Sequence, residues 1–562
     1  MQRVWNIKKH KTNDMIQALL ENRGILDDRE KTDFLNVDYG KLHSPFLFVQ
    51  MKKAAERVWQ AVNNNEKILI YSDYDADAVT ANAVLMRMFE FLGVKPDVYI
   101  PDRFAEGYGL NLAAFRQFKE QGINLVITVD CGTNSVEEAE FCAANGIDLI
   151  ITDHHELTGS EPAAYALINP KNPADKYPYH ELTGVGVAFK LACAVLSDRS
   201  MHSLPGGYEK WFLDLVAIGT VADCHSLLGE NRILVKYGLQ VMAKTKWIGL
   251  KALLEIAGYA DRPLDTYVLG FIIAPRINAA GRLQHAGIAL DLLLANDSRE
   301  AAELARRLEQ LNSKRQMLTE TVMSEAREQL TLISERKILL ASGSNWPKGV
   351  VGLVAGKLTE EFGRPVLVLE RGEEESTGSA RSVNGFNIVE ALNHSSSVLV
   401  KYGGHAQAAG FTLRTEHIEI FYKKLLDFAD SNMGESGDEK LIEIDAEVSG
   451  DDLNMRNFEM IEMFQPFGVG NAAPRLMVSG AEVRQAAAVG KDGKHLQLTV
   501  AVPGSEGPRI IKCIGFGFGR AVQTLTMGRK IDIVFELIAD LWQGRRELKL
   551  RIIDFREAQA GV

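Results

Sequence analysis

The stretch Lys67-Ile68-Leu69-Ile70-Tyr71-Ser72-Asp73-Tyr74-Asp75-Ala76-Asp77 runs from an apolar segment straight into carboxylates at alternate positions. Asp75 and Asp77 share a face of extended backbone, because alternate side chains of a strand point the same way. Clustered carboxylates repel one another and are costly to desolvate unless cations neutralise them. A second polar triplet, Asp153-His154-His155, follows another apolar segment. Carboxylate, imidazole and water suit Mn²⁺ or Mg²⁺, so the pattern predicts a metal-dependent phosphate enzyme.

Composition indicates a soluble protein of several domains. The 562 residues are 46% hydrophobic and 24% charged, and a chain of this length exceeds a single core, so we expect about three or four domains. The five cysteines are scattered without C-x-x-C spacing, which argues against a disulfide framework or a zinc site. No secretion signal or membrane span is visible, so we expect a cytoplasmic protein that makes no membrane contact. The net charge of −11 argues weakly against a nucleic-acid partner, since bound cations and a local basic groove can offset it.

Between residues 66 and 153, short apolar runs alternate with longer amphipathic ones, as in KILIYS, LVITVD and DLIITD. This βαβα rhythm predicts an α/β fold with a doubly wound parallel sheet, whose ligands gather outside the carboxyl ends of the strands. Three polar segments follow such strands: Asp73 to Asp77, Asp130, and Asp153 to His155. We therefore expect them to meet in one crevice.

The rest of the chain suggests further domains. Residues 298–333 contain no Gly or Pro and predict a long connector helix, with a coiled coil as the alternative. Residues 334–430 predict a smaller α/β domain, and residues 441–562, after a polar linker, predict a β-barrel of the OB (oligonucleotide-binding) type. We expect the main domain to cover residues 61–297 and the amino-terminal segment 1–60 to pack against it.

The residues themselves suggest how cations would be held. Asp75 and Asp77 can project into the crevice, Asp130 can bridge two ions, His154 offers an imidazole, and Asp223 is a plausible fifth ligand. Two ions about 3.5–4 Å apart would activate a water and stabilise the leaving oxygen of a phosphoryl displacement. A carboxylate in a turn or helix cap is the alternative for any one of these aspartates taken alone.

Sequence motifs then point to a family. D-Y-D-A-D (73–77), V-D-C-G (129–132), T-D-H-H (152–155) and A-D (222–223) resemble the DHH phosphoesterase superfamily. Blocks across nearly the whole chain resemble the RecJ family of single-strand-specific 5′→3′ exonucleases, namely residues 101–110, 183–190, 275–282, 311–316, 378–382, 403–410 and 466–471. The resemblance implies a DHH domain, a DHHA1 domain and an OB domain.

The resemblance also implies roles for individual residues. The metal ligands would be Asp75, Asp77, Asp130, His154 and Asp223. Catalysis would involve His155, directed at the scissile phosphate, and Asp73, placed outside the direct ligands. Contacts to the 5′-phosphate and the DNA would come from Arg103, Arg276, Asn278, Arg282, Ser379, Arg381, Gly403, Gly404 and His405. Barrel candidates for base stacking and phosphate contact are Phe516, Phe518, Lys512, Arg520 and Trp542.

Several of these residues also have an ordinary structural explanation. Arg103 and Arg381 could form an ordinary surface pair, residues 276–282 could support a Gly-bearing turn, and the barrel candidates could simply pack in a small β-domain. Two positions depart from the family pattern: Ala78 stands where Gly is common, and Pro347 where His is common. The Ala78 methyl leaves metal binding intact in our interpretation, whereas the missing imidazole at Pro347 affects substrate contacts or rate.

The predicted function is a Mn²⁺- or Mg²⁺-dependent exonuclease, binding two cations, that degrades single-stranded DNA 5′→3′ to 5′-mononucleotides in recombination and repair. The enzymatic competitors are a DHH phosphodiesterase of short oligonucleotides or cyclic dinucleotides and, more remotely, a type II pyrophosphatase. A competitor of another class is an inactive scaffold that binds single strands. A single-stranded-DNA-binding protein and a recombination helicase are partners expected from the resemblance alone.

Overall fold

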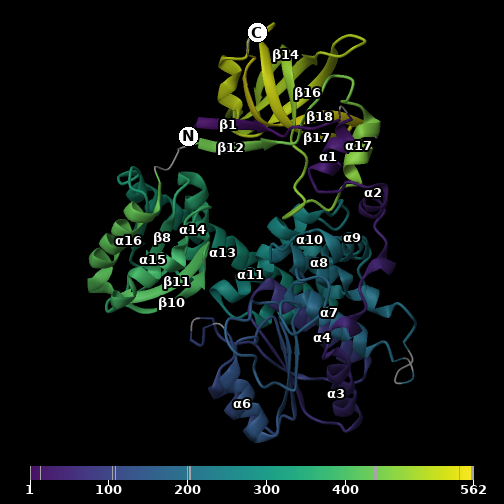
Figure 1. Cartoon of the computed structure of the whole chain (residues 1–562), viewed down its shortest axis with the longest axis vertical. Coiled ribbons are helices and arrows are strands. Elements are labelled where there is room, and N and C mark those ends of the chain that lie inside the picture. Colours follow the sequence, from purple (N-terminus) through teal and green to yellow (C-terminus); the bar gives the residue numbers. More distant parts are fainter. Residues whose placement is uncertain are drawn as a thin grey trace. The chain divides into compact units, whose positions relative to one another are not determined.

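The chain folds into two compact units (Figure 1). This computed structural model describes residues 2–12, 14–103, 105–107, 109–198, 200, 204–434, 439–542 and 545–558. One unit comprises Ser44–Asp223 and Gly238–Asp438, and the other comprises Met1–His43, Cys224–Tyr237 and Glu439–Val562. Within the described ranges, no helix is both long enough and apolar enough to cross a membrane.

The first α/β domain contains the predicted parallel sheet. Its strand order is β3-β2-β4-β5-β6, and every neighbouring pair is parallel. The strands are β2 (Ile68–Ser72), β3 (Asp97–Tyr99), β4 (Leu125–Val129), β5 (Asp148–Thr152) and β6 (Ala166–Ile168). The chain runs from β2 outward to β3 and then returns to the other side of β2 with β4. The order therefore reverses between β2 and β4, and in such sheets a ligand crevice forms outside the carboxyl ends at that point.

Helices cover both faces of this sheet, because its strands are apolar on both sides. On one face, α5 (Leu112–Glu120) and α6 (Val136–Asn145) share a core with alternate strand residues such as Tyr71 and Ile151. Packed together elsewhere in the domain are α3 (Met51–Asn63), α4 (Ala76–Phe91), α7 (Gly184–Val195) and α8 (Leu213–Ala222). The predicted doubly wound architecture is confirmed.

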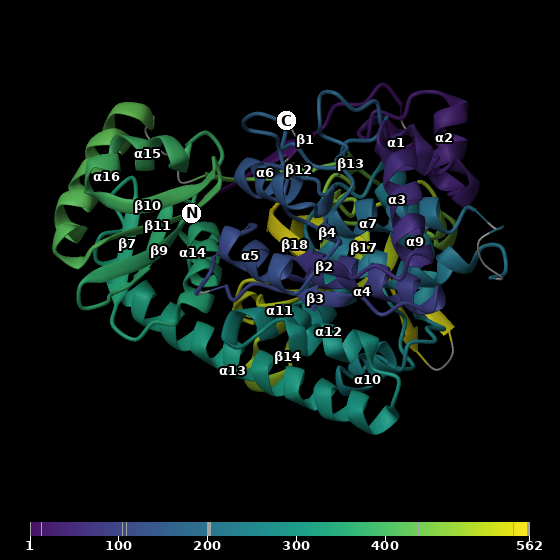
Figure 2. The same ribbon diagram turned by 90° about the horizontal axis from the view of Figure 1, so that it is seen from below.

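A helical layer leads from this domain to the connector. It contains α10 (Ile248–Ile256), the π-helix η4 (Val268–Ile273), α11 (Ala274–Leu283) and α12 (Gly287–Leu294). The connector α13 (Ser298–Thr331) begins at Asp297, whose carboxylate accepts from the amides of Arg299 and Glu300 at 2.9 and 3.0 Å. Figure 2 shows α13 running from beside α10 to α14, and it contacts both helices.

The second α/β domain has a five-stranded mixed sheet in the order β10-β11-β9-β8-β7, in which only β7 and β8 are parallel. Its strands are β7 (Leu339–Gly343), β8 (Val366–Glu370), β9 (Glu375–Arg381), β10 (Leu399–His405) and β11 (Ala408–Arg414). Its helices are α14 (Lys348–Phe362), α15 (Ile388–His394) and α16 (Ile418–Asn432). One face of the sheet shares a core with α13 and α14, and the other with α15 and α16.

The other unit is built around a six-stranded sheet, five strands of which form a closed barrel. Its order is β13-β14-β15-β16-β18-β17, and an added β14–β17 pairing closes the sheet on itself. The elements are β13 (Ala446–Glu447), α17 (Met455–Glu462), β14 (Leu476–Val489), β15 (His495–Val502), β16 (Arg509–Gly515), β17 (Lys530–Trp542) and β18 (Arg545–Glu557). The predicted OB-type barrel is confirmed. The side chain of Trp542 lies outside the described residues.

The amino-terminal segment differs from its prediction, because residues 1–43 belong to the barrel unit and not to the first α/β domain. Strand β1 (Gln2–Ile7) pairs in parallel with β12 (Glu439–Ile444), and α2 (Asp28–Leu35) follows α1 (Met15–Glu21). The buried face of α1, including Leu19 and Leu20, joins the barrel core. This apolar stripe is local in sequence, but the surface that covers it lies more than four hundred residues further along the chain.

Candidate metal centre and active site

Asp75 and Asp77 are fixed by backbone amides at the junction of β2 and α4. Asp75 caps α4, and its Oδ1 accepts from the amides of Asp77 and Ala78 at 2.9 and 3.1 Å. Asp77 is buried and accepts from the amides of Gly184 at 2.6 Å and Val185 at 3.0 Å, at the start of α7. The positive end of the α7 dipole favours a carboxylate there. Both carboxylates are thus oriented before any cation arrives.

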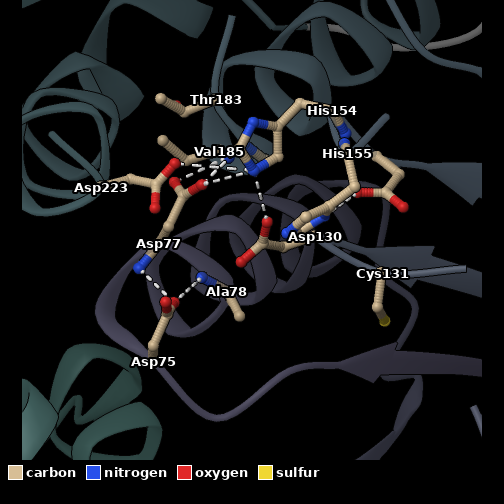
Figure 3. A network of polar contacts seen from close by, with 12 residues as sticks. Asp75, Asp77, Ala78, Asp130, Cys131, His154, His155, Thr183, Val185 and Asp223 are labelled. Atoms are coloured by element: carbon tan, nitrogen blue, oxygen red, sulfur yellow. Dashed lines mark hydrogen bonds and ion pairs between the residues drawn. The ribbon is translucent and has the colours of Figure 1, made fainter. Parts of the chain in front are cut away.

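Asp130 lies directly after β4 in a left-handed backbone conformation with φ of +62°. Such a φ is uncommon outside glycine, and here the Asp130 amide donates to the Thr152 carbonyl at 2.9 Å. His154 points into the same space (Figure 3). Its Nε2 lies 3.0 Å from Asp130 Oδ1, 3.6 Å from Asp223 Oδ2 and 4.0 Å from Asp77 Oδ2. The ligands expected from four separate segments therefore converge around one imidazole.

His155 is positioned by Asp153, for which the sequence suggested no role of its own. Asp153 Oδ1 lies 2.7 Å from His155 Nδ1, and Asp153 also accepts from the amides of Thr133 and His154. Although burial raises the pKa of Asp153, the bonded and charged His155 outweighs it and leaves that pKa below its usual range. The same contact, working against burial, raises the pKa of His155. A carboxylate partner of this kind fixes the orientation and tautomer of an imidazole.

Two groups of ligand atoms share Asp130. Asp73, Asp75 and Asp130 offer atoms that lie within 4.8 Å of one another, and so do Asp130, Asp153, His154 and His155. That Asp130 bridges two ions remains a prediction, for which this sharing supplies the geometry. Asp73, which we expect outside the direct ligands, also offers an atom within reach of the first group.

The electrostatics of the cluster call for a cation. Burial, with neighbouring carboxylates adding to it, raises the pKa of Asp73 to about 8 and raises the pKa values of Asp75, Asp77 and Asp130. Asp73 Oδ1 is buried and has no hydrogen-bond partner among the described residues. An acceptor left in this way costs free energy, which a divalent cation would recover. Oxygen and imidazole donors match the preferences of Mn²⁺ and Mg²⁺, so these residues fit the predicted metals.

A cluster of guanidinium groups lies close to the carboxylates. Arg381 Nη1 donates to Ser379 Oγ and to the Ala380 carbonyl, each at 2.8 Å. The pKa of Arg381 is lowered by burial and by the charge of Arg103. The pKa of Arg282 is lowered to about 10 by burial, with the charges of Arg103, Arg315 and Arg381 adding to the effect and that of Asp75 opposing it. Like charges gathered in this way favour an anion, and a guanidinium fork suits phosphate oxygens.

The Gly403-Gly404-His405 segment lies in the same sheet as Ser379 and Arg381. Ala408 of β11 pairs with His405 on one side and with Arg381 on the other. Gly410 pairs in the same way with Gly403 and Ser379. Residues directly opposite each other in antiparallel strands share a face, so His405 and Arg381 point to one side, two strand spacings or about 10 Å apart. All three residues of the segment are exposed.

Two of the predicted DNA contacts have protein partners instead. Arg276 forms an ion pair with Glu309 at 2.6 Å and donates to the Ile272 carbonyl at 2.6 Å. Asn278 accepts from the amide of Ala76 at 2.8 Å and so holds the turn between Asp75 and Asp77. These contacts favour the alternative in which residues 276–282 support the site. Arg282 also donates to the Gly349 carbonyl at 3.2 Å, but its charged neighbours include the other guanidinium groups of the cluster.

The barrel residues predicted to contact DNA also fall into two sets, one exposed and one in contact with other protein side chains. Phe516 is 60% exposed and Arg520 is exposed. Lys512 is paired with Glu547 at 2.9 Å, and Phe518 packs near Phe555 with ring centroids 5.8 Å apart. Phe516 and Arg520 thus remain available to a ligand, whereas Phe518 contributes to packing.

Sequence reasoning missed several residues besides Asp153. A Cβ at Gly184 would lie 2.5 Å from Asp130 Cβ, and one at Gly219 would lie 2.6 Å from Asp77 Oδ1. These glycines leave room for the ligands, since real Cβ atoms essentially never approach so closely. The motif T-G-V-G-V-A-F-K (183–190) contains Gly184, but no residue near it in the sequence indicates a contact with Asp77 or Asp130.

Fold and site together define a phosphoesterase of the DHH class. The family model of the DHH N-terminal domain matches residues 67–220, the DHHA1 domain model matches residues 335–432, and the RecJ OB domain model matches residues 444–554. Over 543 residues the chain is 38% identical to the single-stranded-DNA-specific exonuclease RecJ of Bacillus subtilis, covering 96% of this chain and 67% of that one. It is 32% identical to the Escherichia coli protein of the same description over 524 residues, covering 90% and 89%. The chain belongs to the RecJ family.

A solved structure supports the same assignment. RecJ from Thermus thermophilus in complex with Mn²⁺ matches with a TM-score of 0.81 at 28% identity, covering 99% of this chain and 80% of that one. The same protein has also been solved with Mg²⁺, with a TM-score of 0.75. Both metals are those predicted from the carboxylate pattern.

Proposed function

We propose that this chain is a Mn²⁺- or Mg²⁺-dependent exonuclease that degrades single-stranded DNA from its 5′ end to 5′-mononucleotides. Two groups of candidate metal ligands share Asp130, and they lie close to a cluster of guanidinium groups. This arrangement is the main observation that supports the proposal. The ligand groups suit hydrolysis of a phosphodiester, and the guanidinium groups suit a terminal phosphate. Together they favour release of one nucleotide at a time from a phosphorylated end.

Different residues of the site have different roles in this proposal. Asp73, Asp75, Asp77, Asp130, His154 and Asp223 would hold two divalent cations. When bound, such cations polarise the scissile phosphate, lower the pKa of water and offset developing negative charge. His155, held by Asp153 at 2.7 Å, is placed to donate to a phosphate oxygen of the scissile group.

The end of the strand would be held by Arg103, Ser379 and Arg381. Gly352 on α14 gives these groups space, since a Cβ there would lie 3.2 Å from Ser379 Oγ and 3.3 Å from Arg381 Nη2. A side chain at this position would compete with a phosphate. The His405 side chain points to the same side of the sheet as that of Arg381 and extends the anion-binding face.

The competing functions are less well supported. A phosphodiesterase of short oligonucleotides would need the two α/β domains but no barrel, and this chain matches the RecJ OB domain over residues 444–554. An inactive scaffold would not need to preserve every predicted ligand. A single-stranded-DNA-binding protein and a recombination helicase remain predictions from the family, with repair and recombination as the setting. A cytoplasmic location remains a prediction from the sequence.

The test is Mn²⁺-dependent digestion of a long single strand and of its duplex, each labelled at either end, beside a dinucleotide and an Asp75→Ala control. We expect 5′-labelled mononucleotide to be released from the single strand alone. Cleavage confined to the dinucleotide would assign the chain to the short-oligonucleotide enzymes. Tight binding without cleavage would assign it to the scaffolds.

A further inference from the structure

Two aromatic rings lie exposed and stacked on the unit that contains the metal centre. Tyr267 is 58% exposed and Phe271 is 70% exposed. Their ring centroids are 5.1 Å apart and their planes differ by 25°. Single exposed hydrophobic residues are common, but two adjacent exposed rings present a larger apolar surface, of the kind that often marks a binding site.

The backbone beneath these rings is a π-helix, a rare element often found at functional sites. Phe271 lies within η4 (Val268–Ile273), and Tyr267 directly precedes it. Asp265 fixes the start of this segment by accepting from the Val268 amide at 2.9 Å. The missing side chain of Gly270 allows close packing, because a Cβ there would lie only 3.3 Å from Val221.

Val221 belongs to the last turn of α8, the helix that ends at Ala222 and presents Asp223 to His154. The rings are therefore carried by an element that packs directly on a helix of the metal centre. A strand leaving the centre along this side would meet them.

Arginines connect the guanidinium cluster to the same element. Burial and the charge of Arg276 lower the pKa of Arg315. The charge of Arg315 in turn helps to lower the pKa of Arg282. Arg276 ties η4 to α13 through the Ile272 carbonyl and Glu309. Arg315 donates to Asn312 Oδ1 at 2.8 Å, and its Nε is buried without a hydrogen-bond partner among the described residues. Positive charge thus extends from Arg381 and Arg282 through Arg315 toward the rings.

We propose that Tyr267 and Phe271 form a base-stacking subsite for the part of the single strand that lies 3′ of the cut, with Arg315 contacting a phosphate on the way. The subsite rests on the proposed function, because it needs a strand threaded past the metal centre. Exposed rings and a line of cations are the two components of sequence-tolerant single-strand binding. The bases of a duplex are already stacked on one another, so the rings would favour unpaired strands.

Binding is measured first, in EDTA so that no cutting occurs. A labelled oligodeoxythymidylate is titrated with the unchanged chain, with Tyr267→Ala/Phe271→Ala, with the ring-preserving Tyr267→Phe/Phe271→Tyr, and with Arg315→Gln. Leu332→Ala serves as the matched control, because Leu332 is 82% exposed on the same unit and lies at the far end of α13. A strand of equal length that lacks bases is titrated in parallel.

Loss of the two rings should weaken binding of the thymidylate about 5- to 150-fold for each base no longer stacked, with no change for the base-free strand. The ring-preserving variant and Leu332→Ala should bind normally. Arg315→Gln should reduce the slope of log affinity against log salt by about 0.7, whereas the ring variant keeps that slope. Mn²⁺ binding by the ring variant, measured by calorimetry, should be unchanged, which shows that its metal centre is intact.

Unchanged affinity in the ring variant would overturn the subsite, and so would an equal loss on the base-free strand. If the ring variant binds the strand normally but no longer binds a protein partner, the rings belong to an interface with that partner. This result would also overturn the subsite. The proposed function is judged separately, by whether the unchanged chain digests the strand with Mn²⁺. Base-dependent binding through the rings without digestion would refute the exonuclease and leave the subsite standing.

Discussion

Replacing Gly184 by alanine tests whether the start of α7 shapes the metal centre. The new Cβ would lie 2.5 Å from Asp130 Cβ and 2.7 Å from Asp130 Oδ1. Carbon atoms are in optimal contact at about 3.5–4.0 Å, so the helix or the carboxylate must shift by about 1 Å. Asp130 is held by its left-handed backbone, and the Gly184 amide is bonded to Asp77 at 2.6 Å, so the shift would reach both ligands.

The magnitude follows from how sensitive reacting groups are to position. A misplacement of about 1 Å costs about 100-fold in rate, and a disturbed ligand support costs about 10- to 100-fold in metal affinity. We therefore expect Gly184→Ala to lose about two orders of magnitude in kcat/KM on a single strand. Binding of Mn²⁺ measured by calorimetry should weaken in parallel.

Gly186→Ala is the matched control, two residues along the same helix. Its Cβ would lie no closer than 3.3 Å to the movable Leu182 Cδ2, so the site should be undisturbed. Alanine is the better helix former by about 1 kcal/mol, so any general effect of Gly→Ala should stabilise the apo protein in both variants. The reasoning is refuted if Gly184→Ala binds Mn²⁺ and cuts DNA as the unchanged protein does, or if Gly186→Ala loses as much.

Three further outcomes are expected. Mn²⁺ at about 100 times its Kd should stabilise the fold by about 2.7 kcal/mol, seen as a rise in Tm that EDTA reverses, and Asp75→Ala should lose this rise; a full rise in that variant would place the metal elsewhere. Arg381→Gln should lose the preference for 5′-phosphorylated over 5′-hydroxyl strands by about 10- to 150-fold, because about 1.5–3 kcal/mol of charged hydrogen bonding is removed; an unchanged ratio of kcat/KM for the two ends would exclude Arg381 as the phosphate contact. Burial raises the pKa of Asp214 from 3.8 to about 6, against hydrogen bonds from Thr245, Leu215 and Trp247. The folded state therefore holds this proton more tightly than the unfolded state, and stability should fall by about 3 kcal/mol as pH rises from about 4 to 6. Asp214→Asn should remove that slope from the free energy of unfolding, and an identical slope in the variant would contradict the assignment.

Much of the first α/β domain could be predicted because its information is local. Apolar segments of strand length, each followed by Asp75, Asp130 or His154, identify parallel strands whose carboxyl ends meet. The connector helix likewise follows from an uninterrupted run of good helix formers, and α13 spans Ser298–Thr331. In both cases the periodicity of neighbouring residues is sufficient.

Contacts between distant segments were beyond that reasoning. Nothing near Gly184 in sequence indicates that its amide meets Asp77, and nothing near Leu19 indicates a barrel core that begins after residue 440. Arg276 and Asn278 could be read as DNA contacts until Glu309 and the Ala76 amide were seen to occupy them. The closeness of Asp73 to Asp75 and Asp130 could likewise be seen only in the folded chain.

The sequence by itself therefore determined the α/β class, the segments that supply ligands and the metals that suit them, because strand periodicity and donor chemistry are properties of short stretches. The tertiary structure alone decided that Asp130 is shared by two ligand groups, that Asp153 holds His155, that residues 1–43 join the barrel unit and that Tyr267 and Phe271 lie exposed near the centre. The physical reason is that burial and distance depend on which remote surfaces pack together. Local patterns indicate that a side chain needs a partner but do not identify the partner.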